Sequence, residues 1–377
     1  SEYPYQSVFS TSEGYFLFDG TRYPTGINTP SLINPNLTWE KSTTKNLGFD
    51  FTFLQSRLTF TADIFERKVT DILIPGGKDY PALIGDDDLP FENAGILKTT
   101  GFELQAKWSD KLANGFRYSV GVALSDDKAK VVSYPSNPTN KIGDGVLYKG
   151  YTVGDIWGYV TGGILQEGDF DGVGANGKPL YHGPYFKGGQ AYPGYIWYQD
   201  LDHDGVITTG LNTVDDPGDR KVIGNNAPRY RYNITANFQY KGFDLDLMFQ
   251  GVGKRDYWLS STSSYWGNGA GSWEVYNNSW TPERTDAKFP MYGSGTGSYP
   301  QTGYLLDASY IKLKQVILGY TFPRALINKI GLEKLRLNLA AYNLFTISDM
   351  PKYYDADYLS DAYPPKRTFS VGIQVGF

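Results

Sequence analysis

The chain has 377 residues, including 31 Tyr and 44 Gly, and aromatic residues make up 16% of it. It contains no Cys and only two His, which excludes disulfides, thiol catalysis, Cys-based zinc sites and any chemistry that needs several imidazoles. The formal net charge is -5, and acidic and basic residues are mixed along the chain, so no surface for nucleic acid is indicated. No apolar run reaches the roughly 18 residues of a membrane-spanning helix.

Large apolar residues alternate with polar residues or Gly in nine segments, the pattern of strands with one apolar face. The seventh segment is less regular, because its apolar parity switches near Gln315 and Val316, which predicts a β-bulge there. The ninth keeps the alternation to the last residue, Phe377. In chain order the predicted strands are 47–53, 58–64, 102–108, 116–124, 230–238, 243–249, 311–320, 335–341 and 369–377.

The connections between these strands alternate in length. Those after the first, third, fifth and seventh strands are short, at about 55–57, 110–115, 240–242 and 321–333. The others are long, at about 68–99, 127–228, 252–308 and 344–367. All short turns therefore lie at one end of the sheet, which is typical of outer-membrane β-barrels with tight periplasmic turns and long extracellular loops.

The two faces of the predicted strands differ in charge. The apolar face carries essentially none, whereas the opposite face suits a wet lumen. A soluble sandwich or barrel could bury the same apolar face against a second sheet. The loop lengths, and Tyr residues near strand ends where interfacial girdles lie, favour the membrane barrel. The charged residues of the polar face are Asp50, Asp63, Glu103, Lys107, Arg117, Arg231, Asp244, Asp246 and Arg336.

Nine strands are an odd number, and residues 1–40 read as an extracellular loop rather than a strand. A bilayer barrel cannot start with an open edge, because unpaired backbone groups are costly in hydrocarbon. The last strand of a closed barrel must also pair with the first. We therefore expect this chain to be the C-terminal part of a larger barrel, with residues 369–377 at its closing seam.

Several segments in order along the chain resemble the C-terminal half of SusC/RagA-type TonB-dependent transporters. Among them are NPNLTWEKSTTKNLGFDF (34–51), NAGILKTTGFELQ (93–105), VGDIWGYVTGGILQ (153–166), DRKVIGNNAPRYRYNITANFQYKGFDLDLMFQG (219–251) and LLDASYIKLKQVILGYTFP (305–323). The resemblance implies an all-β, 22-stranded transmembrane barrel that encloses an N-terminal plug and lies in the outer membrane of a Gram-negative, Bacteroidetes-type cell. It also implies a SusD-like surface lipoprotein as lid and energy from TonB–ExbB–ExbD through the plug.

This sequence departs from the family pattern in lacking a plug, a TonB-interaction segment and a signal peptide. We therefore expect the plug and the first part of the barrel to be a separate or cleaved chain. Phe377 matches the terminal Phe that the barrel-assembly machinery reads in the family.

The segment 200–207, DLDHDGVI, has the start of an EF-hand-type calcium loop: three carboxylates at alternate positions, then Gly for the sharp turn. Asp200, Asp202 and Asp204 would offer carboxylates and Val206 its carbonyl. The closing acid is absent at Leu211. Relatives in the resembled family usually supply an Asp before Arg-x-Val-Ile-Gly, which here is Asp219; Asp215 and Asp216 are alternatives. The segment could instead be a polar turn held by Asx hydrogen bonds. In either case its role would be structural.

The loop 252–308 is rich in aromatic residues whose rings could stack on the apolar faces of sugars. Alternatively, the loop packs on its own rings or against the lid lipoprotein. The candidate substrate-binding residues are Trp258, Tyr265, Trp266, Trp273, Tyr276 and Trp280.

The sequence predicts no catalytic residues, and hence no enzyme. Asp244 and Asp246 share a stripe as paired acids would, but polar residues are expected on any lumen-facing stripe. The resemblance implies active import of oligomeric nutrients, with oligosaccharides favoured and oligopeptides as the alternative. A glycan-binding sandwich without transport, and an adhesin-like barrel, are the other hypotheses.

Overall fold

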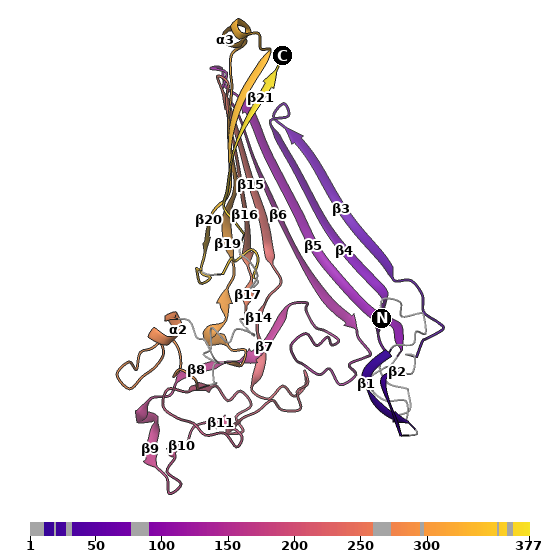
Figure 1. Ribbon diagram of the computed structural model, residues 1–377, viewed down its shortest axis with the longest axis vertical. Helices are drawn as coiled ribbons and strands as arrows, with labels where there is room; N and C mark the ends of the chain where they lie inside the picture. Colours follow the sequence, from indigo (N-terminus) through magenta and orange to yellow (C-terminus); the bar gives the residue numbers. More distant parts are fainter. Residues whose placement is uncertain are drawn as a thin grey trace.

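The computed structural model describes residues 11–18, 20–27, 32–76, 90–258, 273–294, 298–352, 354–359 and 365–377. Its main element is a nine-stranded antiparallel sheet of long strands that lie side by side in the order β21-β20-β19-β16-β15-β6-β5-β4-β3 (Figure 1). The strands are β3 (Lys41–Phe53), β4 (Leu58–Pro75), β5 (Phe91–Lys111), β6 (Arg117–Ser133), β15 (Arg229–Tyr240), β16 (Phe243–Lys254), β19 (Tyr310–Thr321), β20 (Lys334–Ser348) and β21 (Thr368–Gly376).

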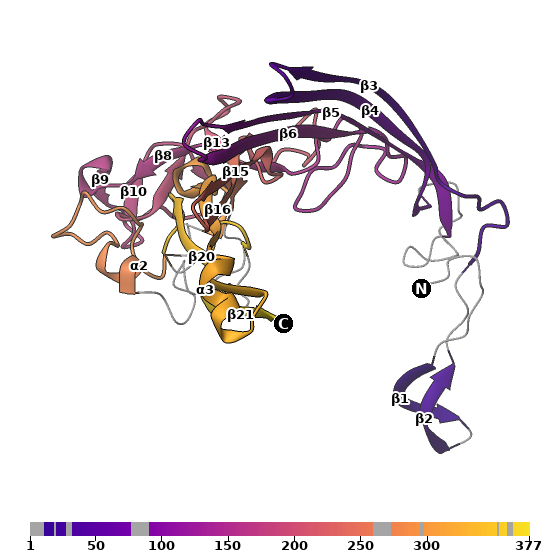
Figure 2. The same ribbon diagram turned by 90° about the horizontal axis from the view of Figure 1, so that it is seen from above.

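Seen along the strands, the sheet is a curved wall with β3 and β21 at its two ends (Figure 2). Among the described residues, each of these two strands pairs on one side only. The nine predicted strands and their antiparallel order are confirmed. Within the same described part of the chain, no helix is long and apolar enough to cross a membrane.

The predicted strand ends were wrong at the long-loop end. β4 continues to Pro75, β5 begins at Phe91 and β6 continues to Ser133, so the loops expected at 68–99 and from 127 are shorter. Charged residues in these extensions obscured the alternation, but they pair across the strands: Lys98 Nζ lies 2.7 Å from Glu66 Oε2. Within the predicted loop 1–40, β1 (Thr11–Phe18) and β2 (Thr21–Ile27) form an antiparallel hairpin.

The predicted bulge in β19 is confirmed at Lys314, immediately before Gln315. The pairing of β19 with both neighbours skips from Leu313 to Gln315. The extra residue changes which side chains face inward. Lys312 and Lys314, two residues apart on the same face, both reach the carboxylate of Asp357.

The outer face of the sheet is apolar and exposed. Its aromatic rings gather at the short-turn end, where Phe51 stacks on Phe53 at 5.7 Å and Phe243 packs on Tyr320 at 4.4 Å between ring centroids. This girdle is the pattern of side chains at a membrane–water boundary. Exposed apolar residues of the outer face include Leu47, Phe49, Phe51, Phe53, Ile64, Val120, Val122, Leu318, Leu337, Leu339, Phe369, Val371 and Ile373.

The inner face is polar and internally hydrogen-bonded. Arg336 Nη2 donates to Asp244 Oδ2 at 2.7 Å, and Thr61 Oγ1 donates to Asp50 Oδ1 at 2.7 Å. Such pairing satisfies the hydrogen-bonding groups of the polar side chains that line the inner face.

The described residues of the connections after β6 and after β16 fold into a lobe at the end opposite the C-terminus (Figure 1). The loop after β6 and the loop after β16 share one hydrophobic core, in which Tyr198 and Phe289 are almost fully buried. Backbone hydrogen bonds join the same loops, as from Tyr159 N to Pro300 O at 2.9 Å. The elements of the lobe are β7 (Asp155–Tyr159), β8 (Thr161–Ile164), η2 (Glu167–Asp169), β9 (Phe170–Val173), β10 (Pro179–Tyr181), β11 (Tyr185–Phe186), β12 (Ile196–Tyr198), β13 (Val206–Ile207), β14 (Arg220–Asn225), β17 (Asp256–Tyr257), α2 (Trp273–Asn277), η4 (Thr302–Tyr304) and β18 (Leu306–Asp307).

At the short-turn end, the connection between β19 and β20 is longer than its counterparts. It contains α3 (Arg324–Ile327) and η5 (Asn328–Ile330).

Candidate functional site

The acidic segment forms a tight loop between β12 and β13. His203 and Gly205 adopt the left-handed conformation, with φ of 63° and 86°. Their backbone amides donate to the two oxygens of Asp200, at 2.7 and 2.8 Å. Asp202 and Asp204 each accept a hydrogen bond from the amide two residues on, at 3.3 and 2.8 Å. These are the Asx bonds that a short polar turn uses.

Asp219 lies directly before β14 and is fully buried beside this loop. It accepts hydrogen bonds from Leu201 N and Thr208 N, both at 2.7 Å, one on each carboxylate oxygen. The carboxylate of Asp219, 18 residues from Leu201 and 11 from Thr208, therefore holds both ends of the acidic segment.

Oxygens of Asp200, Asp202 and Asp219 lie within 4.8 Å of one another. Asp204, Asp215 and Asp216 are outside this group, and Val206 lies in β13, paired with Tyr185. Three converging carboxylates repel one another unless a cation or proton lies between them. Because each oxygen accepts more than one bond, the amides leave capacity for a hard cation such as Ca²⁺.

The electrostatics of the two loop carboxyls differ. Desolvation, together with the negative charges of Asp219 and Asp204, raises the pKa of Asp202. Desolvation also acts on Asp200, but there the amides of Gly205 and His203 outweigh it and lower the pKa. Of these two carboxyls, Asp202 is thus the one whose ionisation its surroundings oppose.

The candidate aromatic residues divide into two sets. Trp258 and Trp280 are buried, 9% and 4% exposed, and Trp280 Nε1 donates to Gln166 Oε1 at 2.9 Å. These two rings pack inside the lobe, as the packing alternative describes. Trp273 and Tyr276 on α2 are 78% and 58% exposed, with their ring centroids 6.0 Å apart. Tyr265 and Trp266 lie outside the described residues.

A second aromatic surface was not predicted. Phe186 contacts Tyr185 at 5.8 Å and Tyr299 at 5.1 Å, and Tyr185 contacts Tyr181 at 6.3 Å. The rings are half-buried or exposed, and burial raises the pKa of Tyr185 to about 12. The many Tyr residues in 181–198 were the available signal for an aromatic surface. Their contact with Tyr299 depends on the tertiary fold and could not be predicted from the sequence.

A cavity of about 590 Å³ lies against the sheet near the loop lobe. Strands β4, β5, β6, β15 and β16 contribute to its wall, and charges of both signs line it. These charged residues are Asp63, Glu103, Arg231, Arg255 and Asp357.

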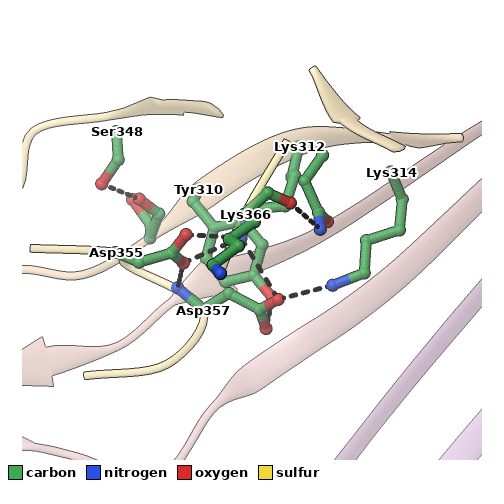
Figure 3. Close-up of polar contacts among 9 residues, drawn as sticks. Tyr310, Lys312, Lys314, Ser348, Asp355, Asp357 and Lys366 are labelled. Atoms are coloured by element: carbon green, nitrogen blue, oxygen red, sulfur yellow. Dashed lines mark hydrogen bonds and ion pairs between the residues drawn. The ribbon is translucent and has the colours of Figure 1, made fainter. Parts of the chain in front are cut away.

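The loop after β20 forms one side of this cavity and is fixed by ion pairs (Figure 3). Lys312 Nζ, on a side chain only 1% exposed, lies 2.8 and 2.9 Å from the oxygens of Asp355 and 3.4 Å from Asp357. Lys314 Nζ and the hydroxyl of Tyr310 donate to Asp357 at 2.9 and 2.6 Å. Desolvation opposes ionisation of Asp357, but these donors and the two lysine charges lower its pKa to about 2.

An antiparallel wall with an apolar outer face, a hydrogen-bonded polar inner face and a folded lobe at one end is part of a membrane-spanning β-barrel. Residues 5–344 match the family model described as TonB dependent receptor-like, beta-barrel, and the chain belongs to this family. It is therefore a protein of the outer membrane.

Relatives agree with this assignment. The chain is 28% identical over 401 residues to TonB-dependent receptor P3 of Formosa agariphila, covering 99% of this chain and 38% of the relative. It is 26% identical over 400 residues to TonB-dependent receptor SusC of Bacteroides thetaiotaomicron, covering 100% of this chain and 36% of SusC. The chain thus spans less than two-fifths of the curated relatives it matches.

The fold is also that of a solved structure described as the RagAB peptide importer in the 'open-open' state. The TM-score is 0.73 at 21% identity, with 100% of this chain and 38% of that chain covered.

Proposed function

We propose that this chain forms part of a SusC/RagA-type importer that takes oligomeric nutrients, preferably oligosaccharides, across the outer membrane. The observation that supports the proposal is that a barrel wall with a polar inner face ends at a folded lobe that exposes aromatic rings. Trp273 and Tyr276 present ring faces that could stack on sugars, and the lumenal cavity lies near the same end of the sheet.

Oligopeptides are the second candidate substrate class. The cavity presents three carboxylates, those of Asp63, Glu103 and Asp357, together with Arg231 and Arg255, a mixture that suits charged and zwitterionic ligands. Peptide is also the substrate printed for the RagAB importer, whose fold is similar.

The partners follow from the same proposal. A SusD-like lipoprotein would cover the lobe, and TonB–ExbB–ExbD would supply energy through a plug from the part of the relatives that this chain does not span. Affinity purification from outer membranes in mild detergent, followed by mass spectrometry, tests this. Recovery without a lipoprotein or a plug-bearing polypeptide would contradict it.

Uptake distinguishes the substrate classes. Cells that lack the gene are compared with wild type for TonB-dependent uptake of fluorescent oligosaccharides and oligopeptides of matched size. We expect loss of oligosaccharide uptake, restored by the wild-type gene and reduced with the double variant Trp273→Ala/Tyr276→Ala. Loss of peptide uptake alone would reassign the substrate, and unchanged uptake of both would overturn the import proposal.

We also propose that Asp200, Asp202 and Asp219 hold Ca²⁺, with Asp204 and the Val206 carbonyl completing the shell. The converging oxygens support this, as does the buried Asp219, whose position fixes the turn. We expect micromolar to millimolar Ca²⁺ to slow chymotrypsin cleavage after Leu201 and Leu211 of the purified protein, and chelator to reverse this. Asp202→Asn should abolish the response and Asp215→Asn, outside the cluster, should keep it. Cleavage independent of Ca²⁺ in the wild type would refute the site.

A further inference from the structure

The connection between β19 and β20 is longer than the chain path requires. Antiparallel neighbours can be joined by two residues, as Lys241 and Gly242 join β15 to β16. Residues 322–333 instead build α3 and η5, which lie beyond the strand ends beside the C-terminus (Figure 1). The additional residues therefore have a use other than reversing the chain.

This short helical element is amphipathic. Ile327 is 3% exposed, so one side packs onto the protein, whereas Leu326 and Ile330 are 58% and 68% exposed. Because they are four residues apart, Leu326 and Ile330 share a face of the helical turn. Arg324 and Lys329 are exposed beside them.

Backbone hydrogen bonds fix the conformation that exposes these apolar side chains. Gly331 takes the left-handed conformation, with φ of 75°, and Leu332 N donates to Ile327 O at 3.2 Å. The next residue, Glu333, donates its amide to Gly376 O at 2.9 Å, which ties the element to the last strand. A capped, tethered turn keeps Leu326 and Ile330 exposed instead of letting them fold away.

The element continues the aromatic girdle of the outer face. Phe322 opens the connection and packs on Tyr320 at 4.8 Å, and Tyr320 packs on Phe243 at 4.4 Å. At this same end Phe116 contacts Phe238 at 6.2 Å. Aromatic girdles mark the level of the lipid headgroups. Leu326 and Ile330 come only a few residues after Phe322 in the chain and therefore start from that level.

We propose that α3 and η5 form a membrane-interface anchor on the leaflet at the short-turn end. Leu326 and Ile330 enter the boundary between headgroups and acyl chains. Arg324 and Lys329 bind the phosphates of anionic phospholipids. Apolar residues beside basic ones are the composition that such interfacial elements use.

The absence of native cysteine from this chain allows a direct test. Ile330→Cys, and separately Leu326→Cys, is labelled with an environment-sensitive fluorophore in the complete protein, reconstituted in phosphatidylethanolamine/phosphatidylglycerol vesicles. Asn114→Cys, exposed in the short turn after β5, is the matched control. Quenching by phospholipids brominated on their acyl chains is compared with quenching by aqueous iodide.

We expect the labels at 326 and 330 to lose at least half their emission to brominated lipid and to resist iodide, with the reverse at 114. Arg324→Gln/Lys329→Gln should reduce the lipid quenching in phosphatidylglycerol-containing vesicles towards its level in vesicles without anionic lipid. Iodide quenching equal to that at 114 would place the element in water and overturn the proposal. Protection from both quenchers would show a protein partner and overturn it equally.

Discussion

The buried lysine beneath the last loop allows a quantitative prediction. Replacing Lys312 by Ala removes the cation that contacts both Asp355 oxygens and leaves that carboxylate, 19% exposed, without its main partner. Removing one member of a buried ion pair typically costs 3–5 kcal/mol. Because Asp355 keeps some solvent contact, we expect about 3 kcal/mol, the lower end of that range. This loss concerns opening of the loop, since the strand pairing of β19 is unchanged.

Hydrogen exchange of the complete protein in detergent measures this effect. The amides of Tyr358 and Leu359 donate to Asp355 O and report whether the loop is closed. Since about 1.4 kcal/mol changes an equilibrium tenfold, protection of a peptide covering 354–359 should fall about 100-fold.

Lys314→Ala is the matched control. Its side chain is 34% exposed and makes one ion pair at 2.9 Å, so we expect less than about 1 kcal/mol, or under fivefold. A change under threefold for Lys312→Ala, or equal effects of the two variants, would refute the reasoning.

Two further predictions concern the same loop and the lobe. The pKa of Asp357 is about 2, below the ordinary value near 3.9, so its contribution to the stability of the closed loop is complete above about pH 4 and is lost as the pH falls towards 2. Protection of 354–359 from hydrogen exchange, corrected for intrinsic exchange, should therefore be constant from pH 7 to 5 and decline below pH 4. A decline that begins at pH 6 would contradict this. Gly162→Ala places a methyl group 2.4 Å from the ring of Trp197, an overlap that should destabilise the lobe by about 1–3 kcal/mol. Trypsin should therefore cleave this variant faster than wild type within 161–198. Gly168→Ala is the control, because its Cβ has open space around it, and trypsin should cleave it at the wild-type rate.

The sheet could be predicted because lipid and lumen impose opposite chemistry on alternate residues. Phe369, Val371 and Ile373 face outward in an unbroken period of two, so the last strand could be recognised from its sequence alone. Even the bulge at Lys314 could be recognised, because the alternation of apolar and polar residues shifts by one position there. Where the strands pass beyond the apolar outer face this constraint ends, and cross-strand pairs such as Glu66 with Lys98 replace alternation, so strand ends were misplaced.

The loops were less predictable because their contacts join distant residues. The sequence placed Trp280 in an aromatic loop, but its hydrogen bond to Gln166 spans 114 residues and no local pattern encodes it. Asp219 was identified only through resemblance to relatives, although it closes the acidic turn. The motif from 200 to 206 was visible in the sequence, but which of its carboxylates lie together was not: Asp200 and Asp202 converge with Asp219, whereas Asp204 accepts a hydrogen bond from Val206 N.

The shared core of the lobe constrains how such receptors can be recombined. Residues after β6, such as Tyr198, pack in the same core as Phe289 from the loop after β16. A graft that carries only one loop from a relative would therefore meet a foreign half-core, with cavities or overlaps of the kind that cost several kcal/mol. Chimeras that move 134–228 together with 255–309 would preserve their mutual packing. Substitutions on either side of this contact are thus expected to be inherited in pairs, and the two loops to diversify as one unit.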